Sequence, residues 1–122
     1  MRLLVLGGSV FVGRHLVAAA HARGDEVSVF NRGRTLAPQP GTTSLVGDRD
    51  GGLDALRTGE WDVVVDTCGF VPRIVRQSAE LLAGRVGRYI FVSSISAFAD
   101  FSAPGLTEAA PRAELTDATS ED

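Results

Sequence analysis

The segment from Leu3 to Val17, LLVLGGSVFVGRHLV, constrains the fold more than any other part of this 122-residue chain. It begins with consecutive apolar residues, which is typical of a short strand buried on both faces of a parallel sheet. Glycines interrupt the run at Gly7 and Gly8, and from Phe11 onward the apolar residues recur at helical spacing. The segment therefore predicts a buried strand, a tight turn and a helix that follows the turn directly.

Short apolar runs alternate with helical or loop segments along the rest of the chain. Four further strands are predicted, at 26–30, 44–46, 62–65 and 89–92, and the last of them is expected to be buried. The first helix is expected to end at Gly24, and a second helix, with Ile74, Val75, Ala79 and Leu82 on its apolar face, is expected between Pro72 and Gly84. A loop at 35–41 replaces one helix, and 53–57 allows one or two helical turns. This alternation predicts an α/β fold with a doubly wound parallel sheet of five strands in the order 3-2-1-4-5.

Composition narrows the class of protein. Hydrophobic residues make up 44% of the chain and charged residues 22%, which is ordinary for a folded domain, and the net charge of −3 disfavours nucleic acid as a partner. No apolar stretch approaches the roughly 20 residues that a membrane helix needs. The single cysteine, Cys68, cannot form an internal disulfide, so we expect a cytoplasmic location. His15 and His21 lie on one helix without the spacing of a metal site, and no metal is expected.

The turn between the first strand and helix carries the clearest functional signal. Its spacing fits G-x-x-G-x-x-G with Val10 in the middle place and Gly8 adjacent to Gly7. Backbone N–H groups at the start of the helix, together with the positive end of its dipole, suit the pyrophosphate of a dinucleotide. The alternative is a tight turn with no ligand. The pattern predicts a Rossmann-type NAD(P) site that includes Gly7, Gly8, Ser9, Val10, Phe11, Val12 and Gly13.

GG-x-x-FVG and the later segment YIFVSS, Tyr89 to Ser94, resemble the short-chain dehydrogenase/reductase superfamily. The resemblance covers essentially the whole chain and is to the extended or atypical side of the superfamily. That side comprises NAD-dependent epimerase/dehydratases and their reductase-like and chloroplast stem-loop-binding relatives. It implies an oxidoreductase, epimerase or dehydratase acting on a nucleotide-sugar-like or small carbonyl substrate. The alternative is a non-catalytic NAD(P)-binding sensor or an RNA-associated protein on the same fold.

The residues after the second strand bear on the choice of cofactor. A carboxylate at this place favours NAD, whereas an arginine suits the 2′-phosphate of NADP, and the sequence here is Asn31-Arg32-Gly33-Arg34. We therefore predict NADP, with NAD as the alternative; two solvated arginines on a loop are the other interpretation. The resemblance further implies that Asp48 and Arg49 hold the adenine, and that Thr67, Cys68 and Gly69 line the nicotinamide ribose. Without the resemblance, Asp48 would be interpreted as a turn residue and Cys68 as a residue that fills space in the core.

The resemblance places a catalytic serine at Ser94, which would hydrogen-bond the substrate oxygen beside a tyrosine of a Tyr-x-x-x-Lys pair. This chain has Ala97-Phe98-Ala99 where many relatives carry valine, tyrosine and glycine. Its only tyrosine, Tyr89, lies within a strand, and it contains no lysine. Residues 1–98 are therefore expected to form the NAD(P)-binding domain, and 99–122 an irregular tail that leads to a catalytic part outside this sequence. By itself the chain is expected to be inactive. We also expect it to self-associate through the open edge of its fifth strand, or through the apolar surface that the catalytic part would cover.

Overall fold

The computed structural model describes residues 1–34, 36–117, 119 and 121. The chain has two compact units, Met1–Val92 and Ser93–Asp122. The first unit contains β1 (Arg2–Leu6), α1 (Phe11–Ala22), β2 (Glu26–Asn31), β3 (Thr43–Val46), the 3-10 helix η1 (Asp54–Leu56), β4 (Trp61–Asp66), α2 (Pro72–Leu82) and β5 (Val86–Phe91).

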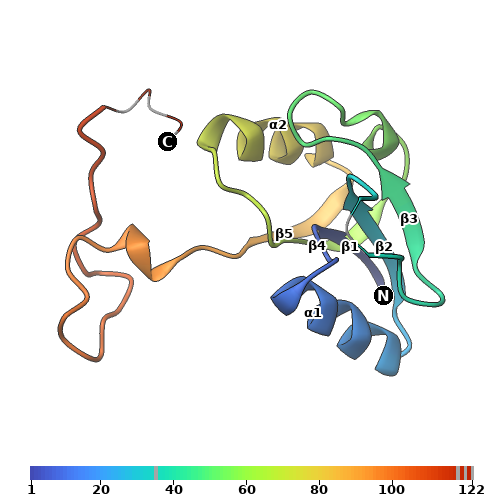
Figure 1. The fold of residues 1–122 in the computed structure, drawn as a ribbon, viewed down its shortest axis with the longest axis horizontal. Coiled ribbons are helices and arrows are strands. Elements are labelled where there is room, and N and C mark those ends of the chain that lie inside the picture. The colour runs from blue at the N-terminus through green and yellow to red at the C-terminus, as the bar shows by residue number, and fades with distance from the viewer. Residues whose placement is uncertain (35, 118, 120, 122) are drawn as a thin grey trace. The chain divides into compact units, whose positions relative to one another are not determined.

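The five strands of the first unit form one parallel sheet in the order β3-β2-β1-β4-β5. The predicted fold class, an α/β doubly wound sheet, is confirmed. β1 is the central strand, and its residues from Leu3 to Leu6 are all buried. Their apolar side chains suit this position, because both faces of a central strand are covered. Figure 1 shows α1 on one side of this sheet and α2 on the other.

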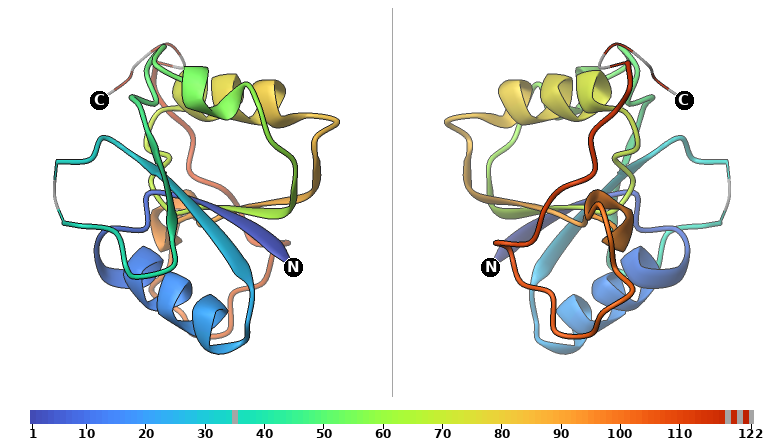
Figure 2. Two further views of the ribbon diagram at one scale, coloured as in Figure 1. Left: turned by 90° about the vertical axis from the view of Figure 1, so that its right-hand side faces the viewer. Right: turned by 90° about the vertical axis from the view of Figure 1, so that its left-hand side faces the viewer.

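Alternate residues of the central strands build a separate core on each face of the sheet. On one face, Val17 and Ala20 of α1 pack with Leu3 and Val5 of β1 and with two valines of β2. On the other face, Leu4 and Leu6 pack with a cluster that includes Phe30, Leu53, Leu56, Trp61, Val64 and Leu82. Both views in Figure 2 show the sheet between its two helices. Because the strands are parallel, the turns and loops that follow β1, β2, β3 and β4 lie at the same edge of the sheet.

Two details of the sheet and of α2 differ from the prediction. β5 begins at Val86, and it is not a buried strand, because Ile90 and Phe91 are each 43% exposed. The physical reason is its position at the edge of the sheet, where it pairs with β4 alone. On α2, the fully buried residues are Ser78 and Leu82, so a hydroxyl occupies part of the face that was expected to be apolar.

The loop after β2 contains no helix over residues 36–41, and Thr35, which begins the predicted loop, lies outside the described residues. The second unit contains the 3-10 helix η2 (Ile95–Ala97) and an antiparallel bridge between Phe98 and Arg112. Its remaining described residues are turns and irregular backbone. Within the described part of the chain, no helix combines the length and the apolar character needed to cross a membrane.

Candidate functional site

A cavity of about 580 Å³ lies in the first unit at the carboxyl ends of its strands. Its walls come from the turn after β1, the end of β2, the loop after β3, the loop after β4 and the first turns of α2. The chain passes from β1 to β2 in one direction along the sheet and adds β4 on the other side of β1. This reversal of strand order opens the crevice in which doubly wound sheets bind their ligands.

The structure brings almost all of the predicted cofactor residues to this one cavity. Every residue of the glycine-rich turn lines it, and so do the predicted residues of the later loops: Gly7, Gly8, Ser9, Val10, Phe11, Val12, Gly13, Asn31, Arg32, Asp48, Arg49, Thr67 and Cys68. Gly69 is the exception. A Cβ atom at Gly69 would lie 2.5 Å from side-chain atoms of both Phe91 and Val75, so this glycine serves close packing behind the wall.

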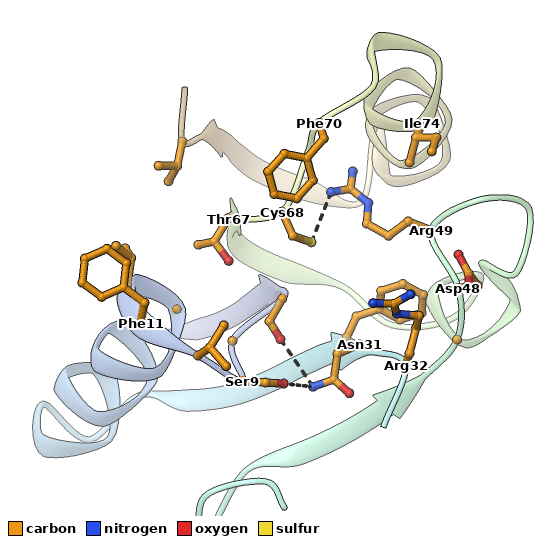
Figure 3. A pocket seen from close by; sticks show the side chains of 18 of the residues that line it. Ser9, Phe11, Asn31, Arg32, Asp48, Arg49, Thr67, Cys68, Phe70 and Ile74 are labelled. Atoms are coloured by element: carbon orange, nitrogen blue, oxygen red, sulfur yellow. Dashed lines mark hydrogen bonds between the residues drawn. The ribbon is translucent and has the colours of Figure 1, made fainter. Parts of the chain in front are cut away.

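Several lining residues were not predicted from the sequence. Phe70 follows the end of β4, and Ile74 lies on the first turns of α2; together with Val71 and Val92 they add an apolar side to the cavity. Phe70 is 89% exposed. Their position in the sequence could have indicated them, because each residue either follows the end of a strand or lies at the start of the next helix. In doubly wound sheets, ligands bind at this end of the strands. In Figure 3, Phe70 and Ile74 lie at one side of the view, and Ser9, Asn31 and Arg32 lie at the opposite side.

The glycine-rich turn is packed too tightly for side chains. Gly7 has φ +107°, and a Cβ atom on it would lie 2.5 Å from Oγ1 of Thr67. A Cβ atom on Gly13 would lie 2.7 Å from the backbone of Gly8, so only glycine lets α1 start this close to the turn. Val10 caps α1 without a side-chain hydrogen bond, and the first turn of the helix holds no acidic residue. The helix therefore presents backbone N–H donors and a positive dipole end to the cavity, which fits a phosphate group.

Phe11, the first residue of α1, has a left-handed backbone conformation with φ +40°. Its side chain is 80% exposed and lies at the cavity (Figure 3). A non-glycine residue in this region costs roughly 1–2 kcal/mol because its Cβ crowds the following carbonyl. Backbone strain of this kind is common at ligand sites. The strained residue, Phe11, directly follows Val10, which occupies the place of the middle glycine of the motif.

Asn31, at the end of β2, is turned back toward the glycine-rich turn and not toward solvent. Its Nδ2 donates to Oγ of Ser9 at 2.8 Å and to the carbonyl oxygen of Gly7 at 3.4 Å. Its Oδ1 accepts a hydrogen bond of 2.7 Å from the backbone N–H of Gly33. Figure 3 shows both bonds from the amide nitrogen. Asn31 thus ties the end of β2 to the turn after β1. The next residue, Arg32, is exposed and lines the cavity.

Asp66, at the end of β4, is a buried carboxylate that the sequence analysis did not single out. Its side chain is fully buried, and its Oδ1 pairs with Nη1 of Arg49 at 2.5 Å. Oδ1 also accepts from the backbone N–H of Cys68 at 3.1 Å, and Oδ2 accepts from the hydroxyl of Tyr89 at 2.7 Å. Arg49 in turn donates from Nη2 to Oγ of Ser78 at 2.6 Å. These groups form one polar cluster, which joins the loop after β3 to β4, α2 and β5.

The cluster sets the protonation of its members. Burial raises the pKa of Tyr89 to about 12; the hydrogen bond with Ser78 opposes this rise, and the bond to Asp66 adds to it. Burial lowers the pKa of Arg49, but the hydrogen bonds to Asp66 and Cys68 outweigh it and leave the pKa above its usual value. Burial also raises the pKa of the Cys68 thiol, against the opposing contact with Arg49. Arg49 is therefore a permanent cation, Tyr89 a neutral phenol and Cys68 a thiol rather than a nucleophilic thiolate.

The side chain of Arg49 is held by other residues of the protein, and its contact with the adenine stays a prediction. Its guanidinium is committed to Asp66 and Ser78, and its Nη1 also lies 3.6 Å from Sγ of Cys68 (Figure 3). Asp48 is exposed at the cavity, and its Oδ1 accepts from the backbone N–H of Asp50 at 3.0 Å in a local turn. Both residues line the cavity, but the side chain of Arg49 also braces the wall.

Ser94 lies in the second unit, where it caps η2. Its Oγ accepts a hydrogen bond of 3.1 Å from the backbone N–H of Ser96 and donates to Oγ of Ser96 at 3.2 Å. Ser94 thus has the local geometry of a helix cap, and its catalytic role stays a prediction. Among the described residues, no group of three or more His, Cys, Asp or Glu side chains could hold a metal ion.

Solved structures share this fold. A short-chain dehydrogenase/reductase superfamily protein from Agrobacterium tumefaciens with bound NAD matches with a TM-score of 0.73 and 24% identity, over 95% of this chain and 40% of its own. A UDP-galactose 4-epimerase matches with a TM-score of 0.71 and 22% identity, over 93% and 45%. MoeE5, in complex with UDP-glucose and NAD, matches with a TM-score of 0.71 and 21% identity, over 93% and 42%. No family model and no curated protein matches the sequence.

At these identities the matches define the fold. The chain matches less than half of the length of each of these three proteins.

Proposed function

We propose that this chain binds a nicotinamide adenine dinucleotide in the cavity at the carboxyl ends of β1, β2, β3 and β4. The observation that carries the proposal is the convergence of the glycine-rich turn, Arg32, Asp48 and Thr67 on one cavity at the switch in strand order. Membership of the extended or atypical short-chain dehydrogenase/reductase family is part of this proposal. The NAD-bound structures that share the fold support it.

The residues present fit each part of such a cofactor. The start of α1 and the turn before it suit the pyrophosphate, because no side chain caps the first N–H groups of the helix and no acidic residue lies in its first turn. Asp48 and the backbone around it suit the adenine, and Thr67 and Cys68 at the end of β4 suit the nicotinamide ribose. When bound, the nicotinamide ring would supply hydride transfer. The chain's own residues hold and orient the cofactor.

Arg32 favours NADP over NAD as the cofactor. It is exposed, lines the cavity and directly follows Asn31, at the place where a carboxylate would otherwise meet the ribose. Calorimetry with NADPH and NADH on wild type and Arg32→Ala tests this. Losing one charge-assisted phosphate contact should weaken NADPH binding by about 1.5–3 kcal/mol and leave NADH nearly unchanged. Arg34, which does not line the cavity, provides the control Arg34→Ala. Equal weakening of both cofactors by Arg32→Ala would contradict the assignment.

The proposed reaction of the whole protein is that of an oxidoreductase, epimerase or dehydratase, with Ser94 orienting the substrate oxygen. The nucleotide-sugar or small carbonyl substrate is also part of this proposal. Within this chain, no lysine is present and the hydroxyl of the only tyrosine is bound to Asp66. We therefore expect no turnover from the 122-residue chain alone. Turnover by the purified chain that disappears in Ser94→Ala would overturn this expectation.

A further inference from the structure

We infer that Asn31 is a positioning residue that orients the hydroxyl of Ser9, so that Ser9 donates its proton into the cavity and toward the bound pyrophosphate. The inference rests on the proposed dinucleotide function and assigns Asn31 a role other than contact with the ribose. It begins from the hydrogen bonds of one amide group, which joins the end of β2 to the turn after β1.

The orientation of the Asn31 amide follows from its two backbone partners. The carbonyl oxygen of Gly7 can only accept a hydrogen bond, and the N–H of Gly33 can only donate one. The amide nitrogen must therefore face Gly7 and the amide oxygen must face Gly33, as the distances of 3.4 Å and 2.7 Å show. A flipped amide would place two donors together and two acceptors together. The group that faces Ser9 is consequently the NH₂ group, a donor.

The direction of the bond to Ser9 decides what the Ser9 hydroxyl can do. At 2.8 Å from Nδ2 of Asn31, the Ser9 oxygen accepts and its own proton points elsewhere. Among the described residues, Ser9 has this one side-chain hydrogen bond, and no acceptor for its proton is found. Ser9 lies on the cavity wall in the turn before α1. Its hydroxyl thus adds a donor to the N–H groups at the start of the helix.

A carboxylate in place of the amide would reverse this arrangement. The side chain of Asn31→Asp has no donor, so it would accept the Ser9 proton and withdraw it from the cavity. It would also place negative charge beside the Gly7 carbonyl and near the phosphate-binding turn. The amide at this position therefore favours anion binding at the turn, while its oxygen keeps the bond to the N–H of Gly33 in either case.

The test is a double-mutant cycle with wild type, Asn31→Asp, Ser9→Ala and the doubly substituted protein, measured by calorimetry with NADH. NADH is the probe because it lacks the 2′-phosphate that a new carboxylate would repel directly. We expect each single substitution to weaken NADH binding by about tenfold, and the double variant to bind no more weakly than the weaker single variant. A direct contact of residue 31 with the ribose predicts the opposite for Asn31→Asp, namely equal or tighter NADH binding, and that result would overturn the inference.

Two controls separate this mechanism from its alternatives. Adenosine contains the ribose but no phosphate, so its affinity, measured by NMR titration, should be the same in all four proteins. A loss of adenosine affinity in Asn31→Asp would indicate a general distortion of the site and would overturn the inference. Effects of the two substitutions that simply multiply would also overturn it, while leaving dinucleotide binding intact. A wild-type protein that binds neither NADH nor NADPH would overturn the proposed function together with the inference.

Discussion

Nη1 of Arg49 and Oδ1 of Asp66 lie 2.5 Å apart, and this ion pair joins two walls of the cavity. Asp66 is fully buried, and Arg49 retains 11% exposure of its side chain. Asp66 is surrounded by further donors from Cys68 and Tyr89, so that its charge is compensated on both carboxylate oxygens. Removing the carboxylate would leave a guanidinium, a phenol and a backbone N–H without their acceptor.

We predict that Asp66→Ala lowers the free energy of unfolding by about 3–5 kcal/mol, because it leaves the buried charge of Arg49 uncompensated. Urea unfolding can be followed by the fluorescence of Trp61, the single tryptophan, which is buried in the core. Asp50→Ala is the matched control, because Asp50 pairs with Arg73 on the surface and both side chains are about half exposed. A control that loses as much stability as Asp66→Ala would contradict this account of the cluster.

Much of the fold could be predicted from the sequence because it depends on local patterns. The apolar run before Gly7 and the helical spacing after Phe11 predicted β1 and α1, and the alternation of such segments predicted the strand order. The polar cluster could not be predicted, since Arg49 and Asp66 are 17 residues apart and each looks like an ordinary loop or strand-end residue. The exposure of β5 was missed because YIFV has the same composition as a buried strand, and only its edge position exposes it.

Tyr89 should give the protein a stability that depends on pH above the neutral range. Its pKa is raised from 10.0 to about 12 in the folded state, so the unfolded chain releases the phenolic proton first. This contribution to the free energy of unfolding is therefore fully present below about pH 10 and is lost as the pH rises toward 12. Tyrosinate absorbance measures the pKa directly, because the chain has one tyrosine.

Tyr89→Phe serves as the comparison for that titration. It cannot ionise, so the part of the pH dependence that comes from Tyr89 should be absent from its urea unfolding between about pH 10 and 12. At neutral pH it should be less stable than wild type, because Asp66 loses one hydrogen bond. An ordinary tyrosine titration near pH 10 in the folded protein would contradict this prediction, because it would mean that the phenol is not buried.

Phe11→Gly should stabilise the protein. Glycine adopts the left-handed conformation of residue 11 without the roughly 1–2 kcal/mol that a Cβ costs there, which exceeds the added backbone entropy of about 0.5–1 kcal/mol. The exposed phenyl ring contributes little buried area to lose. We expect the free energy of unfolding to rise by about 0.5–1 kcal/mol. Phe11→Ala, which keeps the Cβ, should show no such gain, and a gain of equal size in both variants would exclude backbone strain as the cause.

The outer edge of β5 should promote self-association. In the first unit β5 pairs only with β4, and Ile90 and Phe91 are both substantially exposed. Unpaired backbone groups beside apolar side chains are a template for pairing with a second chain. Light scattering should therefore show an average mass that rises with concentration, and Ile90→Lys should reduce this rise. A protein that stays strictly monomeric at high concentration would contradict this prediction.

An NMR titration of the isotope-labelled protein with NADPH tests the central claim most directly, because it shows both whether the dinucleotide binds and where. We predict saturable shifts of the backbone N–H signals of Gly7, Gly8 and Gly13, of Asp48, and of Thr67, all of which line the cavity. The signals of Gly24 and Gly84, which do not line the cavity, should stay unchanged. A complete absence of saturable shifts, or saturable shifts confined to residues outside the cavity, would contradict the claim.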